Sequence, residues 1–242
     1  MIRSKMLPVA FLIFLAFAGV PKSAAEDAVK ILFVGNSYTG QIRKTLTEMT
    51  SGSSMKGAVL EFIIPGGRAL KQHLENEETV ARIRQGGWDF VVLQEQSQTA
   101  GLPGELEKSF HDSVDKLCRI IKKSGAIPVL YMTWGRRDGD KANPSVYATY
   151  EAMQSRLTAA YEKAASRNGA GLAPVGLAWK AVREKNPDIE LYKGDGSHPS
   201  LKGACLTSCV FLQVVFKADP ESVGSVKGVS PEEFALFQSV AK

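Results

Sequence analysis

The chain has 242 residues, 44% of them hydrophobic and 23% charged, and carries a formal net charge of +5. This length suits one domain with a full core, and the chain contains no low-complexity tract or internal repeat. No basic stripe is interleaved with aromatic residues, so nucleic acid is not an expected partner.

The first 25 residues predict a secretory signal peptide. Arg3 and Lys5 precede an apolar run over residues 6–20, and small residues follow up to Ala25. The run is short for a membrane span, which needs about 20 residues; an uncleaved N-terminal anchor is the alternative. We expect cleavage after Ala25, one secreted or periplasmic domain over residues 26–242, and no stable membrane span afterwards. Removing Arg3, Lys5 and Lys22 from the 30 basic residues leaves 27 against 25 acidic ones, a net charge of about +2.

Apolar runs alternate with helical patterns along the rest of the chain. In order, the sequence predicts a strand at 30–34, a helix at 40–52, a strand at 59–64, helical residues at 69–86 in one or two pieces, a strand at 90–93, a helix at 105–124, a strand at 127–132, a helix at 145–168, a weak strand at 172–175, and helices at 176–186, 200–216 and 231–240. Alternation of this kind is typical of a parallel sheet covered on both faces, an α/β fold.

In open α/β sheets, sites form at the carboxyl ends of the strands. Several chemically useful residues follow the predicted strands or lie in a late Gly/Pro-rich loop. They are Ser37, the Gly66-Gly67 pair, Gln94, Gln96, Trp134, Arg136, and the Asp195/His198 pair. Singly these features are weak, because a serine after a strand is more often a helix cap and a glycine pair usually makes a turn. The other histidines, His73 and His111, are expected at the surface.

Together these residues supply the parts that acyl transfer needs. A serine hydroxyl is a poor nucleophile until a base takes its proton, and His198 is the candidate base. Asp195 would hold the imidazole tautomer. The oxyanion of the tetrahedral intermediate needs preorganised donors, for which the Ser37 and Gly67 backbone N–H groups and the Gln96 amide are the candidates. This chemistry requires no metal and no organic cofactor.

The motifs resemble those of the SGNH hydrolases, the GDSL-type esterase and lipase superfamily. GNS at 35–37 is similar to the block that holds the nucleophile, PGG at 65–67 to the block with a backbone oxyanion donor, and DGSHP at 195–199 to the block with the Asp and His. The resemblance spans the whole mature chain and implies a three-layer α/β/α sandwich with about five parallel strands in flavodoxin-like order.

The third block departs from the superfamily pattern, which places an Asn amide in the oxyanion hole. This chain has Gln94-Glu95-Gln96-Ser97 there. Laying the strand ends together puts Gln96 at the Asn position, with Gln94 as the fallback. VVLQEQS and DGSHPS look like a less-studied bacterial branch of the superfamily, similar to secreted esterases.

Candidate pocket residues follow the fourth predicted strand. Trp134 and Arg136 follow a predicted strand, so a stacking surface for a sugar or acyl group and a cation for an acidic group are one interpretation. A solvated loop in which Asp138 and Asp140 pair with the arginines is the favoured one. Tyr147, Tyr150, Met153 and Leu157 fall at helical spacing and are interpreted as core.

The three cysteines, Cys118, Cys205 and Cys209, are an odd number in a chain predicted to be secreted. Free, mostly buried thiols are favoured over a bridge between Cys205 and Cys209, which lie four apart on a predicted helix. No histidine neighbours them at zinc-ligand spacing.

The sequence therefore predicts a serine esterase acting on a small-molecule or carbohydrate ester, with an O-acetyl group on a carbohydrate as the favoured substrate. The alternatives are a non-catalytic carbohydrate-binding protein on the same fold and an O-acyltransferase. The sequence sets no oligomeric state.

Overall fold

The computed structural model describes residues 28–52, 55, 57–218 and 223–242. The predicted signal peptide and its cleavage site after Ala25 lie outside the described residues. No helix of the described part combines the length and the apolar character that a bilayer span needs.

Five parallel strands form one sheet in the order β2–β1–β3–β4–β5. They are β1 (Lys30–Val34), β2 (Val59–Ile63), β3 (Phe90–Leu93), β4 (Ile127–Tyr131) and β5 (Gly171–Ala173). The chain moves outward from β1 to β2 and then returns to the other side of β1, where β3 pairs with it. In open α/β sheets, such a reversal of strand order is where ligand sites form, here at the carboxyl ends of β1 and β3. The predicted flavodoxin-like order is confirmed.

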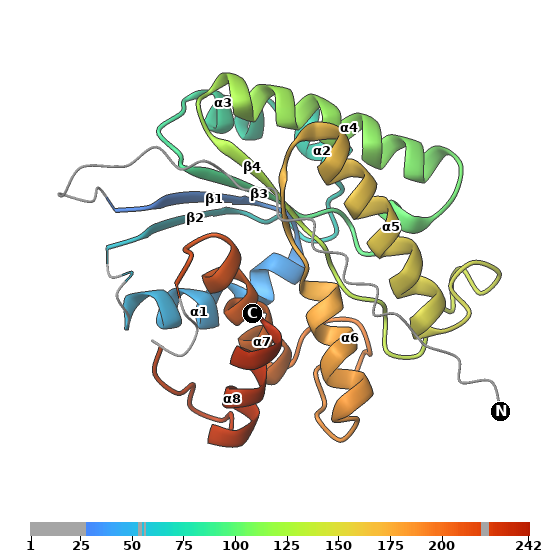
Figure 1. Ribbon diagram of the computed structural model, residues 1–242. Coiled ribbons are helices and arrows are strands. Elements are labelled where there is room, and N and C mark those ends of the chain that lie inside the picture. The colour runs from blue at the N-terminus through green and yellow to red at the C-terminus, as the bar shows by residue number, and fades with distance from the viewer. Residues whose placement is uncertain (1–27, 53–54, 56, 219–222) are drawn as a thin grey trace, which may run out of the picture.

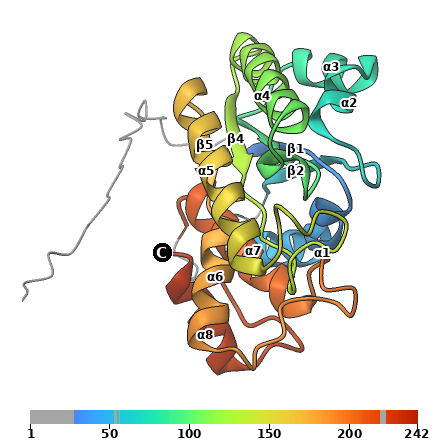
Figure 2. The same cartoon turned by 90° about the vertical axis from the view of Figure 1, so that its right-hand side faces the viewer.

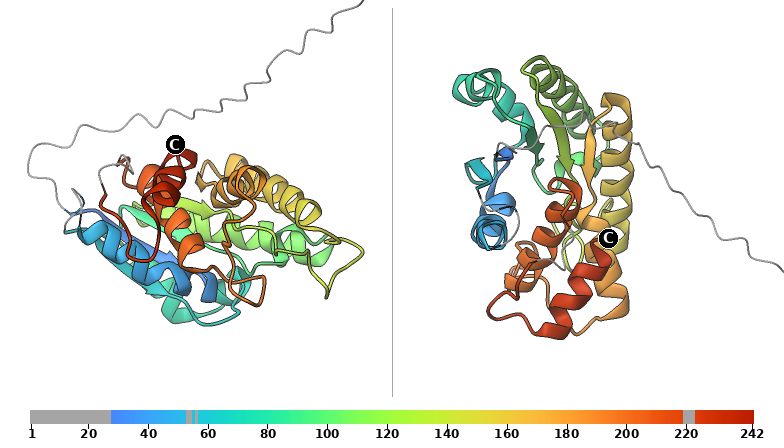
Figure 3. Two further views of the ribbon diagram at one scale, coloured as in Figure 1. Left: turned by 90° about the horizontal axis from the view of Figure 1, so that it is seen from below. Right: turned by 60° about the vertical axis from the view of Figure 1, so that its left-hand side comes forward.

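Helices cover both faces of the sheet, as Figures 1 and 2 show. On one side lie α2 (Leu70–Leu74), α3 (Glu77–Arg84), α4 (Glu105–Lys123) and α5 (Tyr150–Asn168). On the other lie α1 (Ser37–Ser51), α6 (Val175–Lys185), α7 (Leu201–Val214) and α8 (Pro231–Val240). Figure 3 shows the same layers from two further directions. The three-layer α/β/α architecture is confirmed.

Two apolar cores lie between these layers, one on each face of the sheet. Within β1, Leu32 and Val34 pack toward α2–α5, whereas Ile31 and Phe33 pack toward α1 and α7. All four side chains are buried, which explains why the strand reads as a continuous apolar run. Burial of both faces fixes the strand register, because a shift by one residue would exchange the two cores.

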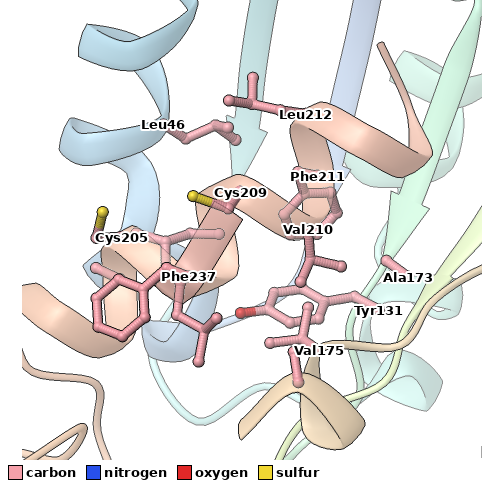
Figure 4. Close-up of a cluster of buried hydrophobic side chains, with 14 of the residues drawn as sticks. Leu46, Tyr131, Ala173, Val175, Cys205, Cys209, Val210, Phe211, Leu212 and Phe237 are labelled. Atoms are coloured by element: carbon pink, nitrogen blue, oxygen red, sulfur yellow. The ribbon is translucent and has the colours of Figure 1, made fainter. Parts of the chain in front are cut away.

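The core around α7 contains two of the three cysteines (Figure 4). Cys205 and Cys209 are fully buried beside Phe237 and Phe211, and both thiols are free. Cys118 is free and buried in the opposite core. The prediction of free, buried thiols is confirmed.

Two helices begin more than one residue away from their predicted starts, and side-chain caps explain both. Helix α1 begins at Ser37, three residues early, because the Asn36 side chain accepts a hydrogen bond from Tyr38 N and caps the helix. Helix α5 begins at Tyr150, five residues late, because Thr149 caps it by accepting from Ala152 N. The residues before Thr149 form a turn instead, closed by a bond from Asp140 N to Tyr147 O.

Candidate active site

Ser37 lies where β1 ends, as the first residue of α1. Its Oγ is 2.8 Å from His198 Nε2, a residue that lies 161 positions further along the chain. The turn into the helix requires glycine at position 35, since a Cβ there would lie 2.6 Å from Thr39 Oγ1 and 2.7 Å from Gln94 Oε1. The tight turn therefore presents Ser37 at the carboxyl edge of the sheet.

Asp195 completes a hydrogen-bonded chain through His198. His198 Nδ1 donates to Asp195 Oδ2 over 2.6 Å, which leaves Nε2 free to accept from the Ser37 hydroxyl. Asp195 Oδ1 accepts from the backbone N–H groups of Ser197 and His198, both at 2.9 Å. Partial burial opposes ionisation of Asp195, but the bonds from His198 and from these N–H groups prevail and lower its pKa to about 2. The carboxyl group is therefore ionised at neutral pH.

A column of buried aromatic rings supports the loop that carries Asp195 and His198. Trp134 stacks on Trp179 with centroids 3.8 Å apart, and its other neighbour in the stack is Tyr38, at 4.9 Å. Two polar groups of the column reach the loop. Trp134 Nε1 donates to Ser197 O at 3.0 Å, and the Tyr38 hydroxyl is 2.6 Å from Ser197 Oγ. Tyr38, the residue after Ser37, is thereby tied to Ser197, the residue before His198.

This arrangement corrects the interpretation of Trp134 as a substrate-stacking residue. Its side chain is 0% exposed, and Tyr38 and Trp179 stack against it. No ring surface is left for a sugar or an acyl group. The tryptophan instead braces the loop that holds His198.

The three predicted oxyanion donors come from three separate segments. The Ser37 N–H is at the first position of α1, where no intrahelical acceptor exists. Gly67 lies in an exposed turn after β2 with φ of +67°, a conformation that favours glycine. Gln96 follows β3 and is partly buried. All three segments leave the carboxyl ends of β1, β2 and β3, which are neighbours in the sheet.

The hydrogen bonds of Gln96 fix the orientation of its amide. Gln96 Oε1 accepts from Gln98 N at 2.8 Å and from Thr99 Oγ1 at 3.2 Å. Gln96 Nε2 therefore carries the two hydrogens, and one of them is donated to Gln98 Oε1 at 3.0 Å. The second hydrogen remains for another acceptor.

Gln94, the fallback donor, is engaged elsewhere. It is fully buried, and its Oε1 accepts from Asn36 N at 3.0 Å and from Thr39 Oγ1 at 2.9 Å. Its amide nitrogen donates to Glu95 O. Through these bonds the Gln94 side chain stabilises the turn before Ser37. The interpretation of Gln94 as a substrate-binding or oxyanion residue is corrected accordingly.

Arg136 lies in the loop after β4 and pairs with a buried carboxylate. Its Nη1 is 2.8 Å from Asp140 Oδ1, and the Asp140 side chain is 0% exposed. Asp140 Oδ2 also accepts from Gln98 Nε2, the neighbour that orients Gln96. Arg137 pairs with Asp138 at 3.3 Å. The predicted pairing of the arginines with Asp138 and Asp140 agrees with this loop, whereas the prediction that the loop is solvated is wrong at Asp140, whose carboxylate is buried.

Both remaining histidines are buried, which contradicts the prediction of surface positions. His73 Nε2 is 2.8 Å from Gly35 O, and desolvation lowers the pKa of His73 to about 4 despite this hydrogen bond. His111 is 7% exposed in the α4 core face. The spacing of His73 three residues after the buried Leu70 is the sequence signal that places it on the inner face of its helix.

Glu95 is a candidate functional residue that the sequence analysis did not identify. Its carboxyl group is buried and accepts from Leu70 N at 3.1 Å and from Gln96 N at 2.6 Å, which joins the segments after β2 and β3. A charged residue inside a strand-end motif is usually solvent-exposed, so only the flanking buried strand hinted at its position. Among the described residues, no group of three His, Cys, Asp or Glu side chains is placed to hold a metal ion.

Solved structures resemble this fold. A protein from Slackia heliotrinireducens described as a candidate SGNH hydrolase is 31% identical, with 77% of this chain and 98% of that one covered and a TM-score of 0.65. A DUF4886 family protein from Bacteroides uniformis is 19% identical, with 88% and 93% covered and a TM-score of 0.73. An acetylxylan esterase from Geobacillus stearothermophilus is 13% identical, with 77% and 94% covered and a TM-score of 0.58.

No protein-family model matches the chain, and no curated protein matches it. The likeness to the Slackia protein nevertheless spans most of both chains at 31% identity. The chain belongs to the SGNH hydrolase superfamily.

Proposed function

We propose that the mature chain is a secreted serine esterase that works through Ser37, His198 and Asp195. The observation that carries the proposal is the unbroken chain of hydrogen bonds from Ser37 Oγ through both His198 ring nitrogens to Asp195, with distances of 2.8 and 2.6 Å. This is the geometry that a base-activated nucleophile requires. Residues 1–25 would direct secretion, and residues 26–242 would form the one catalytic domain.

The mechanism follows from these three side chains. Ser37 Oγ attacks the carbonyl carbon of the ester while His198 Nε2 takes the hydroxyl proton. Nε2 then gives this proton to the departing alkoxide, so that an alcohol leaves and Ser37 stays acylated. A water molecule attacks the acyl carbon, loses a proton to Nε2, and Ser37 departs with that proton. Asp195, ionised throughout, stabilises the imidazolium that forms in each half.

The oxyanion of each tetrahedral intermediate would be bound by the Ser37 and Gly67 N–H groups and by Gln96 Nε2. The first is a helix N-terminal group, the second lies in an exposed turn, and the third has a hydrogen left to donate. Fixed donors of this kind are commonly the largest single contribution to acyl transfer.

An O-acetyl group on a carbohydrate is the proposed substrate. The Geobacillus protein acts on acetylated xylan, and catalytic mutants described for it change a serine, an aspartate and a histidine, with the last two three residues apart. Asp195 and His198 have the same spacing here. The likeness in fold and spacing supports a related ester.

The test compares the mature chain with its Ser37→Ala variant on p-nitrophenyl acetate, butyrate and octanoate, and on acetylated xylo-oligosaccharides. We expect turnover that decreases with acyl length, acetate release from the oligosaccharides, and loss of both in the variant at unchanged thermal stability. Equal turnover by Ser37→Ala would sink the proposal. If no ester is cleaved, a fluorophosphonate that fails to label Ser37 would indicate a binding protein, and acetyl transfer to an added sugar would indicate a transferase.

A further inference from the structure

The carboxyl group of Glu95 is buried and has no role in the proposed mechanism. It is 1% exposed, yet it lies at the end of β3 beside the proposed oxyanion hole. Burying a carboxyl group is costly unless it makes good hydrogen bonds. Desolvation raises the pKa of Glu95 to about 7, in spite of the bonds donated by Gln96 N and Leu70 N.

The contacts of Glu95 join two segments that supply oxyanion donors. A single oxygen, Oε1, accepts from Leu70 N at 3.1 Å and from Gln96 N at 2.6 Å. Leu70 begins α2, three residues after Gly67, whereas Gln96 carries the proposed donor amide. Glu95 Oε1 thus links the backbone of Leu70, three residues after Gly67, to the backbone of Gln96.

The third donor is tied to the same frame by neighbouring bonds. Asn36 Nδ2 donates to Arg68 O at 3.0 Å, which joins the Ser37 turn to the Gly67 turn. Gln94 Oε1 accepts from Asn36 N, which joins the Ser37 turn to the end of β3. With Glu95 in place, each of the three donor segments is linked to the other two.

We propose that Glu95 is a positioning residue of the oxyanion hole, whose Oε1 holds the Gly67 turn and Gln96 at the separation that the oxyanion requires. The inference rests on the proposed function. Glu95 acts through the backbone and touches no reacting atom. The acceptor oxygen holds the two backbone N–H groups, and the negative charge is not needed for this. A glutamine, whose neutral amide has the same shape, should therefore replace Glu95.

The titratable neighbour of Glu95 carries no charge at neutral pH. The titratable side chain that faces it across the core is Tyr161 of α5, whose hydroxyl is 3.3 Å from Glu95 N. Burial raises the pKa of Tyr161 above its ordinary value, so this hydroxyl stays neutral. Tyr161 therefore stays uncharged while Glu95 gains or loses its proton near neutral pH. Both the carboxylate and the carboxylic acid of Glu95 retain Oε1 as a hydrogen-bond acceptor.

The experiment uses the full chain with Glu95 changed to Gln, Asp and Leu. Gln retains the acceptor oxygen, Asp withdraws it by one carbon, and Leu removes it. Asp115→Leu is the matched control, because Asp115 joins α4 to the end of α5 through Arg167 and Asn168, at the opposite edge of the sheet. Readouts are kcat, KM, thermal stability, and the Ki of an aryl trifluoromethyl ketone, which forms an oxyanion on the serine.

We expect Glu95→Leu to lower kcat by about 10- to 100-fold with little change in KM, since small misplacements of reacting groups cost about 100-fold. The ketone should bind more weakly by a similar factor. Glu95→Asp should lie between, and it carries the test if Glu95→Leu does not fold. Glu95→Gln should retain most of the wild-type kcat. Asp115→Leu should lower thermal stability without changing kcat.

The inference is overturned if Glu95→Asp and Glu95→Leu retain wild-type kcat and ketone affinity, or if Glu95→Gln loses as much kcat as Glu95→Leu. A parallel loss of kcat in Asp115→Leu would also overturn it, because general destabilisation would then explain the effect. Failure of the proposed function is distinct: the wild-type chain would itself show no Ser37-dependent turnover.

Discussion

The two halves of the site are built in different ways. The half that would transfer protons is local and partly open to solvent: Asp195 and His198 lie three residues apart, with side chains 49% and 29% exposed. The half that would bind the oxyanion is assembled from segments far apart in sequence, and its supports, Gln94 and Glu95, are buried. A short loop is enough to form the first, whereas the second requires the whole sheet edge.

This difference predicts where changes affect activity and where they affect folding. An exposed pair contributes little to stability, because water and salt screen it. A buried polar group that loses its partner costs about 1–3 kcal/mol. Substitutions in the Asp195–His198 loop should therefore reduce catalysis and leave stability nearly intact, whereas substitutions under the oxyanion half should affect both.

The largest expected effect is that of Asp195→Asn. The asparagine oxygen can still accept from the Ser197 and His198 N–H groups, so the free energy of unfolding should change by no more than about 0.5 kcal/mol. The amide cannot hold the Nδ1–H tautomer of His198, so kcat should fall by about 10⁴-fold, the size of this effect in serine proteases. Steady-state kinetics and thermal melts check both. A large drop in stability at unchanged kcat would erase the contrast between the halves.

The buried half gives a pH prediction through His73. Its pKa of about 4 lies below that of a free histidine, so the unfolded chain binds a proton that the folded chain does not. Stability from this group is complete above about pH 6.5 and is lost as the pH falls toward 4, by up to about 3 kcal/mol. Glu95 acts in the opposite direction, because its raised pKa favours the folded state as the pH falls from about 7 toward 4.5.

In the wild type the effects of His73 and Glu95 on the pH dependence of stability oppose each other. His73→Gln should remove the first effect and leave the second measurable. The glutamine amide can replace the donor to Gly35 O but does not titrate. Urea unfolding at pH 7, 6 and 5 should then show the variant gaining stability on acidification relative to the wild type. Parallel pH profiles for both proteins would mean that folding does not lower the pKa of His73.

The two glutamines after β3 provide the next contrast. Gln96→Ala should lower kcat by about 100-fold or more through loss of an oxyanion donor, with little effect on stability. Gln94→Ala should cost about 1–3 kcal/mol of folding free energy, because it leaves Asn36 N and Thr39 Oγ1 without their buried acceptor. Kinetics and chemical denaturation of both variants measure this. If Gln94→Ala alone lost kcat at full stability, the two roles would be exchanged.

The same residues show which parts of the fold and the site could be predicted from the sequence alone. The strand-helix alternation and the Asp-x-x-His spacing are local patterns, so the fold and the residues brought together at Ser37 could be predicted. The choice between Gln94 and Gln96 could be ranked but not settled, because it depends on which amide the Asn36 turn uses. The burial of Trp134 depends on its neighbours in the aromatic column, which come from other parts of the chain.

The smallest expected effect tests the link between the halves. Tyr38→Phe removes the hydroxyl that contacts Ser197 Oγ but keeps the ring stacked on Trp134. A single hydrogen bond contributes about 0.5–1.5 kcal/mol, so we expect kcat to fall by up to about tenfold while KM stays the same. Ser197→Ala, which removes the other partner, should give the same loss, and the double variant should lose no more than either. Additive losses in that cycle would show that Tyr38 does not position His198 through Ser197.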